Sequence, residues 1–130
     1  MSELTCVAEG KTKQLREHNG ALNQLLVTFK DKATAFNAVK VAEVPGKGAL
    51  NATISAILFQ WLESQGIPTC FVEKTGKANE LVYRRLKMIP LEVVVRNMAF
   101  GSLCKRFPQF EQGQPLKNPL VEFFLKDDKA

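Results

Sequence analysis

The sequence predicts an α+β fold with a mainly antiparallel sheet and one long helix. Apolar runs of strand length lie in groups on both sides of a single helical segment, instead of alternating with helices. The dipeptide Asn19-Gly20 is a strong signal for a tight hairpin turn between two strands. Only the segment at about residues 50–65 repeats apolar side chains at clear helical spacing.

The composition sets limits on the class of protein. The chain has 130 residues, which fits one domain or part of a larger protein, and carries a net charge of +5. That charge favours anionic partners such as nucleotides, sugar phosphates or nucleic acid. The three cysteines are scattered and odd in number, which favours a reduced, cytoplasmic protein. No apolar stretch approaches about 18 residues, so we expect no membrane-spanning helix.

The single histidine narrows the possible chemistry. His18 lies in the polar stretch REHNG, which is typical of a surface turn. A hydrolase of the Ser-His-Asp type would have to rely on this one residue. A zinc site with two histidines is impossible, and we assign no metal ligand from the sequence.

The N-terminal part of the chain is predicted to form a hairpin followed by a loop. Residues 5–15 have the pattern of a strand interrupted at Glu9-Gly10, and Leu22–Phe29 forms the returning strand of a hairpin. Lys30–Gly48 is polar and contains Pro45-Gly46, so it is predicted as a functional loop.

The long helix is predicted at about Leu50–Gln65, ended by Gly66 and Pro68. Its apolar side chains recur on one face, and we expect this stripe to lie in the core. The members of the stripe are Leu50, Ile54, Ile57, Leu58, Trp61 and Leu62.

Further elements follow the helix. The predicted strands are Thr69–Lys74, Leu81–Leu86, Leu91–Arg96 and Val121–Leu125, with a short helix at Ser102–Phe107 and a turn-rich stretch at Gln112–Pro119.

Two anion-binding sites are suggested near the N-terminus. Strand alternation would place Lys11 and Lys13 on one face, about 7 Å apart, where they could hold two phosphates of a polyphosphate. Gly10 would let the backbone approach the ligand closely. Lys47-Gly48 precedes the long helix, whose N-terminus could also hold an anion. Two exposed lysines on a hairpin and a plain loop-to-helix junction are the alternatives.

A third anion site is predicted after the strand Leu91–Arg96. Glu92, Val94 and Arg96 share one face of it, which suits a strand that lines a ligand pocket, although a half-exposed strand is the alternative. The planar guanidinium of Arg96 matches a phosphate or carboxylate. Ser102 could add a hydroxyl to the same anion.

Several segments together resemble the SAICAR synthetases (phosphoribosylaminoimidazole-succinocarboxamide synthases), which are ligases of purine biosynthesis. The matching segments are EGKTKQ at 9–14, FKDKATAFNA at 29–38, GKGALNATIS at 46–55, GIPTCFVE at 66–73, MIPLEVVVRNMAFGSLCKR at 88–106 and VEFFLKDD at 121–128. The resemblance implies an ATP-binding lobe at residues 1–86 and the start of a central substrate-binding domain at residues 87–130.

The family resemblance also implies an activity. Its members join aspartate to carboxyaminoimidazole ribonucleotide, with ATP and Mg²⁺, through a phosphorylated carboxylate that the aspartate amine attacks. Such chemistry depends on positioned charges more than on an acid–base histidine.

The family pattern implies roles for individual residues. Lys11 and Lys13, beside Gly10, resemble the contacts to the ATP phosphates. The segment Leu86-Lys87-Met88 resembles the connector whose backbone meets the adenine edge. The remaining implied residues are Arg96, Ser102 and Arg106 as contacts to the ribonucleotide, and Lys126 as a catalytic lysine.

One departure from the family pattern matters for activity. Family members continue past the segment KDD into a second half, which supplies acidic magnesium ligands and further substrate contacts. The sequence here lacks that half, so we expect little or no ligase activity from the isolated chain. It could instead act as a nucleotide-binding module or a half-enzyme, completed by self-association or by a separate C-terminal half. Nucleic-acid binding is a further alternative, which the positive charge permits. However, aromatic residues do not alternate with the basic residues of this chain in the pattern that base stacking needs.

Overall fold

The computed structural model describes residues 5–18, 23–35 and 40–126. The chain divides into two compact units, Met1–Leu86 and Lys87–Ala130. The assignment of the first unit to ATP and of the second to the substrate stays a prediction.

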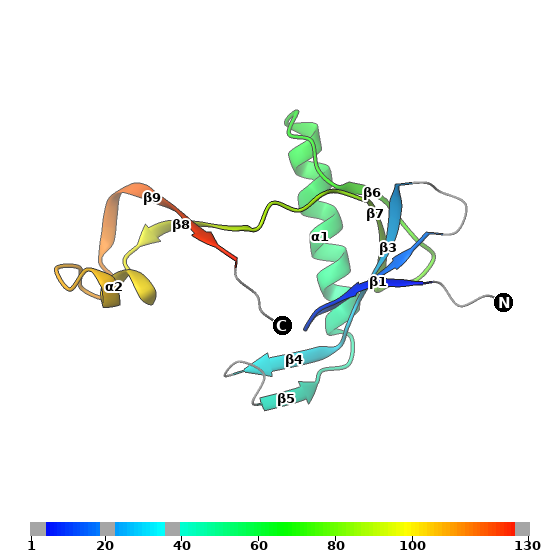
Figure 1. Ribbon diagram of the computed structural model, residues 1–130, viewed down its shortest axis with the longest axis horizontal. Coiled ribbons are helices and arrows are strands. Elements are labelled where there is room, and N and C mark those ends of the chain that lie inside the picture. Colours follow the sequence, from blue (N-terminus) through cyan, green and yellow to red (C-terminus); the bar gives the residue numbers. More distant parts are fainter. Residues whose placement is uncertain (1–4, 19–22, 36–39, 127–130) are drawn as a thin grey trace. The chain divides into compact units, whose positions relative to one another are not determined.

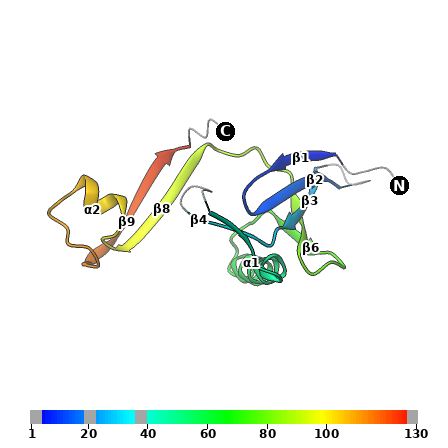
Figure 2. The ribbon, with the colours of Figure 1, turned by 90° about the horizontal axis from the view of Figure 1, so that it is seen from below.

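The first unit is a five-stranded antiparallel sheet with a long helix on one face (Figures 1 and 2). The helix α1, Lys47–Ser64, contacts the central and edge strands β3, β7 and β6. In the order β1-β2-β3-β7-β6, the strands are Cys6–Glu9, Lys13–Glu17, Gln24–Phe29, Glu80–Arg84 and Phe71–Lys74. The predicted α+β class is therefore confirmed.

The N-terminal hairpin is confirmed, with one strand more than predicted. β2 pairs with β3 in antiparallel register, with Leu15 opposite Val27. The turn dipeptide Asn19-Gly20 lies outside the described residues. The expected single strand at residues 5–15 is instead the antiparallel pair β1 and β2. The backbone N–H of Gly10 donates to the carbonyl of Lys13 over 2.9 Å, which closes a turn at this point.

The prediction of a loop at Lys30–Gly48 was wrong. Strands β4, Lys32–Ala35, and β5, Lys40–Glu43, form a separate two-stranded antiparallel sheet in this segment. The polar composition gave no strand signal, because each strand is short. The backbone groups of β4 and β5 are satisfied only when the two strands pair.

The helix prediction was right in position and wrong about the buried face. The side of α1 against the sheet carries small residues four apart, Gly48, Ala52 and Ala56, which are buried. At about 100° per residue, the predicted apolar stripe lies on the opposite side. Five of its members are 46–61% exposed: Leu50, Ile54, Ile57, Leu58 and Trp61.

The bulk of the first core comes from the sheet. Small side chains let the helix backbone approach closely, and large side chains from three strands fill the space between the layers. The buried cluster comprises Val27, Phe29, Ala52, Ala56, Phe71, Leu81 and Tyr83. Phe59 of α1 adds to it by stacking on Phe71 and meeting Tyr83 edge to face.

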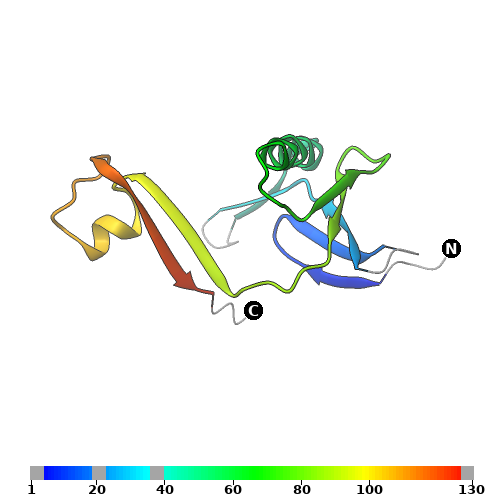
Figure 3. The ribbon, with the colours of Figure 1, turned by 90° about the horizontal axis from the view of Figure 1, so that it is seen from above.

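The second unit is a two-stranded antiparallel ribbon with a short helix at one end (Figure 3). β8 spans Leu91–Met98, α2 spans Ser102–Arg106 and β9 spans Pro115–Leu125. The predicted helix and the strand starting at Leu91 are confirmed. The stretch at Gln112–Pro119 is turn only at its beginning, because β9 starts at Pro115, opposite Met98. Proline is tolerated at the first residue of a strand.

One face of this ribbon is apolar and exposed. Leu91, Val93 and Val95 project from it and are 42–61% exposed. Their partners in register across the ribbon are Leu125, Phe123 and Val121, which are 50–74% exposed. A two-stranded ribbon is marginally stable alone in water, so this face requires a cover for full stability.

Candidate functional site

Arg96 is the centre of the polar face of the ribbon. Its Nε donates to Glu122 Oε2 over 2.7 Å, and its Nη2 donates to Ser102 Oγ over 2.9 Å. Its Nη1 donates to the carbonyl of Phe100 over 3.1 Å. The guanidinium therefore connects β8, the turn before α2, α2 itself and β9. The predicted neighbours Arg96 and Ser102 are together, as the strand-to-helix order suggested.

Arg106 belongs to the same cluster. One of its Nη groups donates to Glu122 Oε1, and its Nε donates to the carbonyl of Ser102 over 3.3 Å. Its Cζ also lies 5.4 Å and 5.2 Å from the ring centroids of Phe107 and Phe124. The aromatic rings and the hydrogen bonds together orient this second guanidinium.

Glu122 is the residue of this cluster that sequence reasoning missed. Its side chain is only 11% exposed and accepts hydrogen bonds from both arginines. The bond from Arg106 and then that from Arg96 hold the pKa of Glu122 below its ordinary range. A glutamate within the apolar strand VEFF was the available signal, because a charge partly removed from water needs a partner.

The turn between β1 and β2 carries the predicted phosphate contacts in an unexpected arrangement. Lys11 lies in the turn and is exposed, so the expectation that it shares a strand face with Lys13 was wrong. Lys13 begins β2 and places its ammonium 5.0 Å from the centroid of the Phe29 ring. The turn thus presents one exposed cation, and a second that is held against the sheet.

Lys30 holds this turn in place and was not identified from the sequence. Its ammonium donates to the carbonyl of Gly10 over 2.9 Å and pairs with Glu9, and its backbone N–H donates to the carbonyl of Thr12 over 2.9 Å. The hydrogen bond from Lys30 also lowers the pKa of Glu9. Lys30 therefore contacts three consecutive parts of this turn, at Glu9, Gly10 and Thr12.

The N-terminus of α1 already has an anionic partner within the chain. The carboxylate of Asp31 accepts the N–H of Gly48 over 2.7 Å and that of Gly46 over 3.1 Å. The N–H groups that a ligand anion would bind are therefore already satisfied within the chain, and such a ligand stays a prediction. Asp31 acts as the cap, and a ligand would have to displace it.

The connector Leu86–Met88 lies between β7 and β8. Leu86 is 57% exposed and Met88 is 82% exposed. Among the described residues, no hydrogen bond uses the backbone groups of Leu86, Lys87 or Met88. Within the described part of the chain, these backbone groups therefore have no hydrogen-bond partner.

Lys126 lies at the opposite end of the ribbon from Arg96. Its backbone N–H donates to the carbonyl of Pro90 over 2.9 Å, which places it level with the start of β8. Arg96 is six residues further along, or about 20 Å at the usual rise of a strand. The structure thus brings Arg96, Ser102 and Arg106 together, and leaves Lys126 apart from them.

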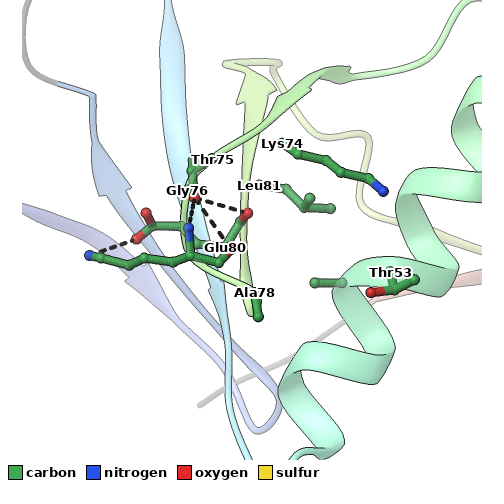
Figure 4. A pocket seen from close by; sticks show the side chains of 9 residues that line it. Thr53, Lys74, Thr75, Gly76, Ala78, Glu80 and Leu81 are labelled. Atoms are coloured by element: carbon green, nitrogen blue, oxygen red, sulfur yellow. Dashed lines mark hydrogen bonds and ion pairs between the residues drawn. The ribbon is translucent and has the colours of Figure 1, made fainter.

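A cavity of about 240 Å³ lies between α1 and the β6–β7 turn (Figure 4). Thr53 lines it from the helix, and Lys74, Lys77 and Glu80 line it from the hairpin. Glu80 is buried and lies 3.6 Å from Lys77 Nζ and 3.6 Å from Arg16 Nη2. None of the predicted site residues lines this cavity.

The described residues contain neither a metal-binding cluster nor a membrane-spanning helix. Over residues 5–18, 23–35 and 40–126, no three His, Cys, Asp or Glu side chains gather closely enough to hold a metal ion. Within the same ranges, no helix is long and apolar enough to cross a membrane. Cys6, Cys70 and Cys104 are free thiols.

Comparison with known proteins identifies the family. The family model for SAICAR synthetase matches residues 6–130, which is nearly the whole chain. The chain therefore belongs to the SAICAR synthetase family.

Individual relatives give the same result. Phosphoribosylaminoimidazole-succinocarboxamide synthase of Picosynechococcus sp. is 55% identical over 121 residues, covering 92% of this chain and 47% of that protein. A solved SAICAR synthetase (Type-2) in complex with ADP superposes with a TM-score of 0.84 at 45% identity, covering 94% of this chain and 51% of the other. The synthase from Ehrlichia chaffeensis gives a TM-score of 0.85 at 38% identity, with coverage of 96% and 52%. The chain thus spans about half the length of these relatives.

Proposed function

We propose that the chain carries the ATP-binding lobe and the start of the substrate-binding domain of a SAICAR synthetase-type ligase. Such a ligase joins aspartate to carboxyaminoimidazole ribonucleotide, with ATP as co-substrate. The observation that carries the proposal is the cluster of Arg96, Ser102 and Arg106, within a segment that the family model matches.

The proposed contact to the ribonucleotide is through its phosphate. A guanidinium has five N–H donors, and the hydrogen bonds of Arg96 within the described residues use three of them. Two N–H groups, one on each Nη, are left for the phosphate. Arg106 and the Ser102 hydroxyl lie beside them, so one phosphate could receive charge-assisted hydrogen bonds from several directions.

The proposed contacts to ATP lie in and after the first unit. Lys11 on the β1–β2 turn is exposed and would meet a phosphate, and Gly10 lets the backbone come close. Lys13 would exchange its contact with the Phe29 ring for a phosphate oxygen. The backbone groups of Leu86–Met88, which form no hydrogen bond to other described residues, would bind the adenine edge. Support comes from the related structure that was solved with ADP.

Lys126 is proposed as a catalytic lysine, which would stabilise negative charge as phosphate is transferred. It would act on the end of the substrate away from the phosphate, because about 20 Å of strand separates its backbone from that of Arg96. The described residues form no metal-binding cluster, so the proposal assigns no residue to Mg²⁺.

Ligand binding tests this proposal directly. Calorimetric titration with carboxyaminoimidazole ribonucleotide should show binding by the unaltered chain. Arg96→Lys should weaken it roughly ten-fold or more, because lysine lacks the planar fork. Arg84→Lys, on an exposed arginine of β7, is the matched control and should bind as the unaltered chain does. Equal affinity for Arg96→Lys and the unaltered chain would refute the role of Arg96.

Turnover tests a separate part of the proposal. With ATP, aspartate and the ribonucleotide together, we expect the 130-residue chain to release little or no ADP. Clear turnover by the pure chain would contradict the expectation that a second half is needed.

The alternative function is a half-enzyme or nucleotide-binding module, completed by self-association or by a separate C-terminal half. Two exposed apolar faces favour it, one on α1 around Trp61 and the other on the ribbon around Phe123. Sedimentation analysis should then show self-association of the pure chain, or a complex with a polypeptide that corresponds to the rest of the relatives. A strict monomer that binds neither that polypeptide nor nucleotide would exclude this alternative.

A further inference from the structure

Glu122 links two guanidiniums that would otherwise repel one another. Each of its carboxylate oxygens accepts a hydrogen bond from a different arginine, Oε2 from Arg96 and Oε1 from Arg106. The cluster therefore carries two positive charges and one negative charge within hydrogen-bonding distance. A carboxylate inside an anion-binding site subtracts from its attraction for anions, so its presence there calls for a physical reason.

The geometry offers that reason. The bond to Glu122 occupies the Nε side of Arg96, while Phe100 and Ser102 accept from its two Nη groups. With that side fixed, the two remaining N–H donors have a defined direction. Without the bond to Glu122, only the two bonds from the Nη groups would hold the guanidinium, and it would lose more conformational entropy when an anion bound.

Arg106 is oriented by the same carboxylate. Its side chain is 40% exposed, more than the 16% of Arg96, so it depends on its neighbours for a fixed position. Glu122 draws its Nη group inward, while Phe107 and Phe124 contact the guanidinium plane. Both arginines are thus held in place before any ligand arrives.

We propose that Glu122 is a positioning residue, which aligns the guanidiniums of Arg96 and Arg106 for a single phosphate group. This inference rests on the proposed function of that cluster. It goes further by giving an acidic residue a favourable role in binding an anion.

The direction in which Glu122→Gln changes the affinity for phosphate distinguishes a positioning role of Glu122 from an effect of its charge alone. If only net charge matters, Glu122→Gln removes a negative charge and strengthens phosphate binding. If Glu122 positions the arginines, the same substitution weakens binding, because a neutral amide holds two guanidiniums poorly. We expect a loss of roughly ten-fold, the scale of one hydrogen bond to a charged group.

The experiment uses the whole 130-residue chain, with ribose 5-phosphate as the probe and NMR titration as the measurement. The control is Glu111→Gln, which makes the same change of charge on an exposed residue of the same unit. The control should bind as well as the unaltered chain or slightly better. Glu122→Asp keeps the charge on a shorter side chain, so its affinity should lie between those of the unaltered chain and Glu122→Gln.

A second readout separates positioning from general loss of structure. The Nε–H signals of Arg96 and Arg106 should collapse toward those of free arginine in Glu122→Gln, while the backbone amide signals of β8 and β9 stay in place. If Glu122→Gln does not fold, Glu122→Asp decides the matter, and affinity equal to or above that of the unaltered chain overturns the proposal.

The outcomes distinguish this inference from the proposed function beneath it. If the unaltered chain does not bind ribose 5-phosphate, both fail together. If it binds, and Glu122→Gln binds equally or more tightly, the positioning role alone is overturned. Weaker binding with intact β8 and β9 signals supports it.

Discussion

Replacement of Gly48 by alanine gives a sharp test of how α1 is seated on the sheet. In most helices this change stabilises the protein by up to about 1 kcal/mol, because alanine is the better helix former. Here a Cβ at residue 48 would lie 2.4 Å from the carbonyl oxygen of Phe29 and 3.0 Å from Asp31 Oδ1. We therefore expect the opposite sign.

The magnitude follows from the size of that overlap. Ordinary contact for a Cβ begins at 3.4 Å, so the helix or β3 would have to move by about 1 Å. Overpacking of this kind costs about 1–3 kcal/mol, and the hydrogen bond from the Gly48 N–H to Asp31 would be strained as well. The strain on that hydrogen bond, about 1 kcal/mol, roughly cancels the gain in helix propensity, so we expect Gly48→Ala to lower the free energy of unfolding by roughly 1–3 kcal/mol.

Urea denaturation followed by helical circular dichroism measures this loss. With slopes of about 1–3 kcal/mol per molar urea, the midpoint should fall by roughly 1 M. Gly76→Ala is the matched control, since nothing lies within 4 Å of its added Cβ, and it should change stability by less than about 0.5 kcal/mol. A Gly48→Ala variant as stable as the unaltered chain, or more stable, would refute the reasoning.

Four further predictions test the caps, the charges and the exposed face. Asp31→Ala removes the cap of α1 and should lower the free energy of unfolding by about 1–2 kcal/mol in urea titrations. Since its arginine partners lower the pKa of Glu122, the stability that it contributes is present above the ordinary glutamate pKa and is lost as the pH falls through its lowered pKa. Urea midpoints measured toward acid pH should therefore fall more steeply for the unaltered chain than for Glu122→Gln. Burial raises the pKa of Tyr83 to about 12, so stability should fall as the pH rises above about 10, and Tyr83→Phe should reduce that fall. Trp61→Lys should change stability by less than about 0.5 kcal/mol, because this side chain is 59% exposed, and a loss of several kcal/mol would show that Trp61 is a core residue.

Local sequence patterns predicted the positions of helices and strands in this protein better than they predicted which elements pack or pair with one another. The helix at α1, the strand at Leu91 and the short helix after Gly101 follow from apolar spacing and turn residues over a few positions. The pair β4 and β5 was missed, because neither strand has an apolar pattern strong enough to identify it alone. Pairing between strands is a non-local property, so it appears only when both are placed side by side.

The buried face of α1 shows the same limit. Periodicity identified Leu50 and Trp61 as members of one stripe, and the stripe exists, but the sheet binds the opposite side through Ala52 and Ala56. Hydrophobicity ranks residues by the gain on burial, and it cannot tell which neighbour is available to bury them. In this chain the sheet accepts small residues, because its own aromatic side chains already fill the space.

The candidate site also has one part that the sequence predicted and one part that only the tertiary structure revealed. The sequence alone determined that Arg96 and Ser102 would meet, since a strand, a glycine turn and a helix start lie within seven residues of one another. The tertiary structure alone decided that Glu122, 26 residues away along the chain, joins them. It also decided that Asp31 caps the helix N-terminus, which the sequence suggested only as a possible anion site. The physical reason is the distance along the chain between the interacting residues. Backbone geometry dictates what residues a few positions apart can do, whereas contacts between distant segments depend on how whole elements pack.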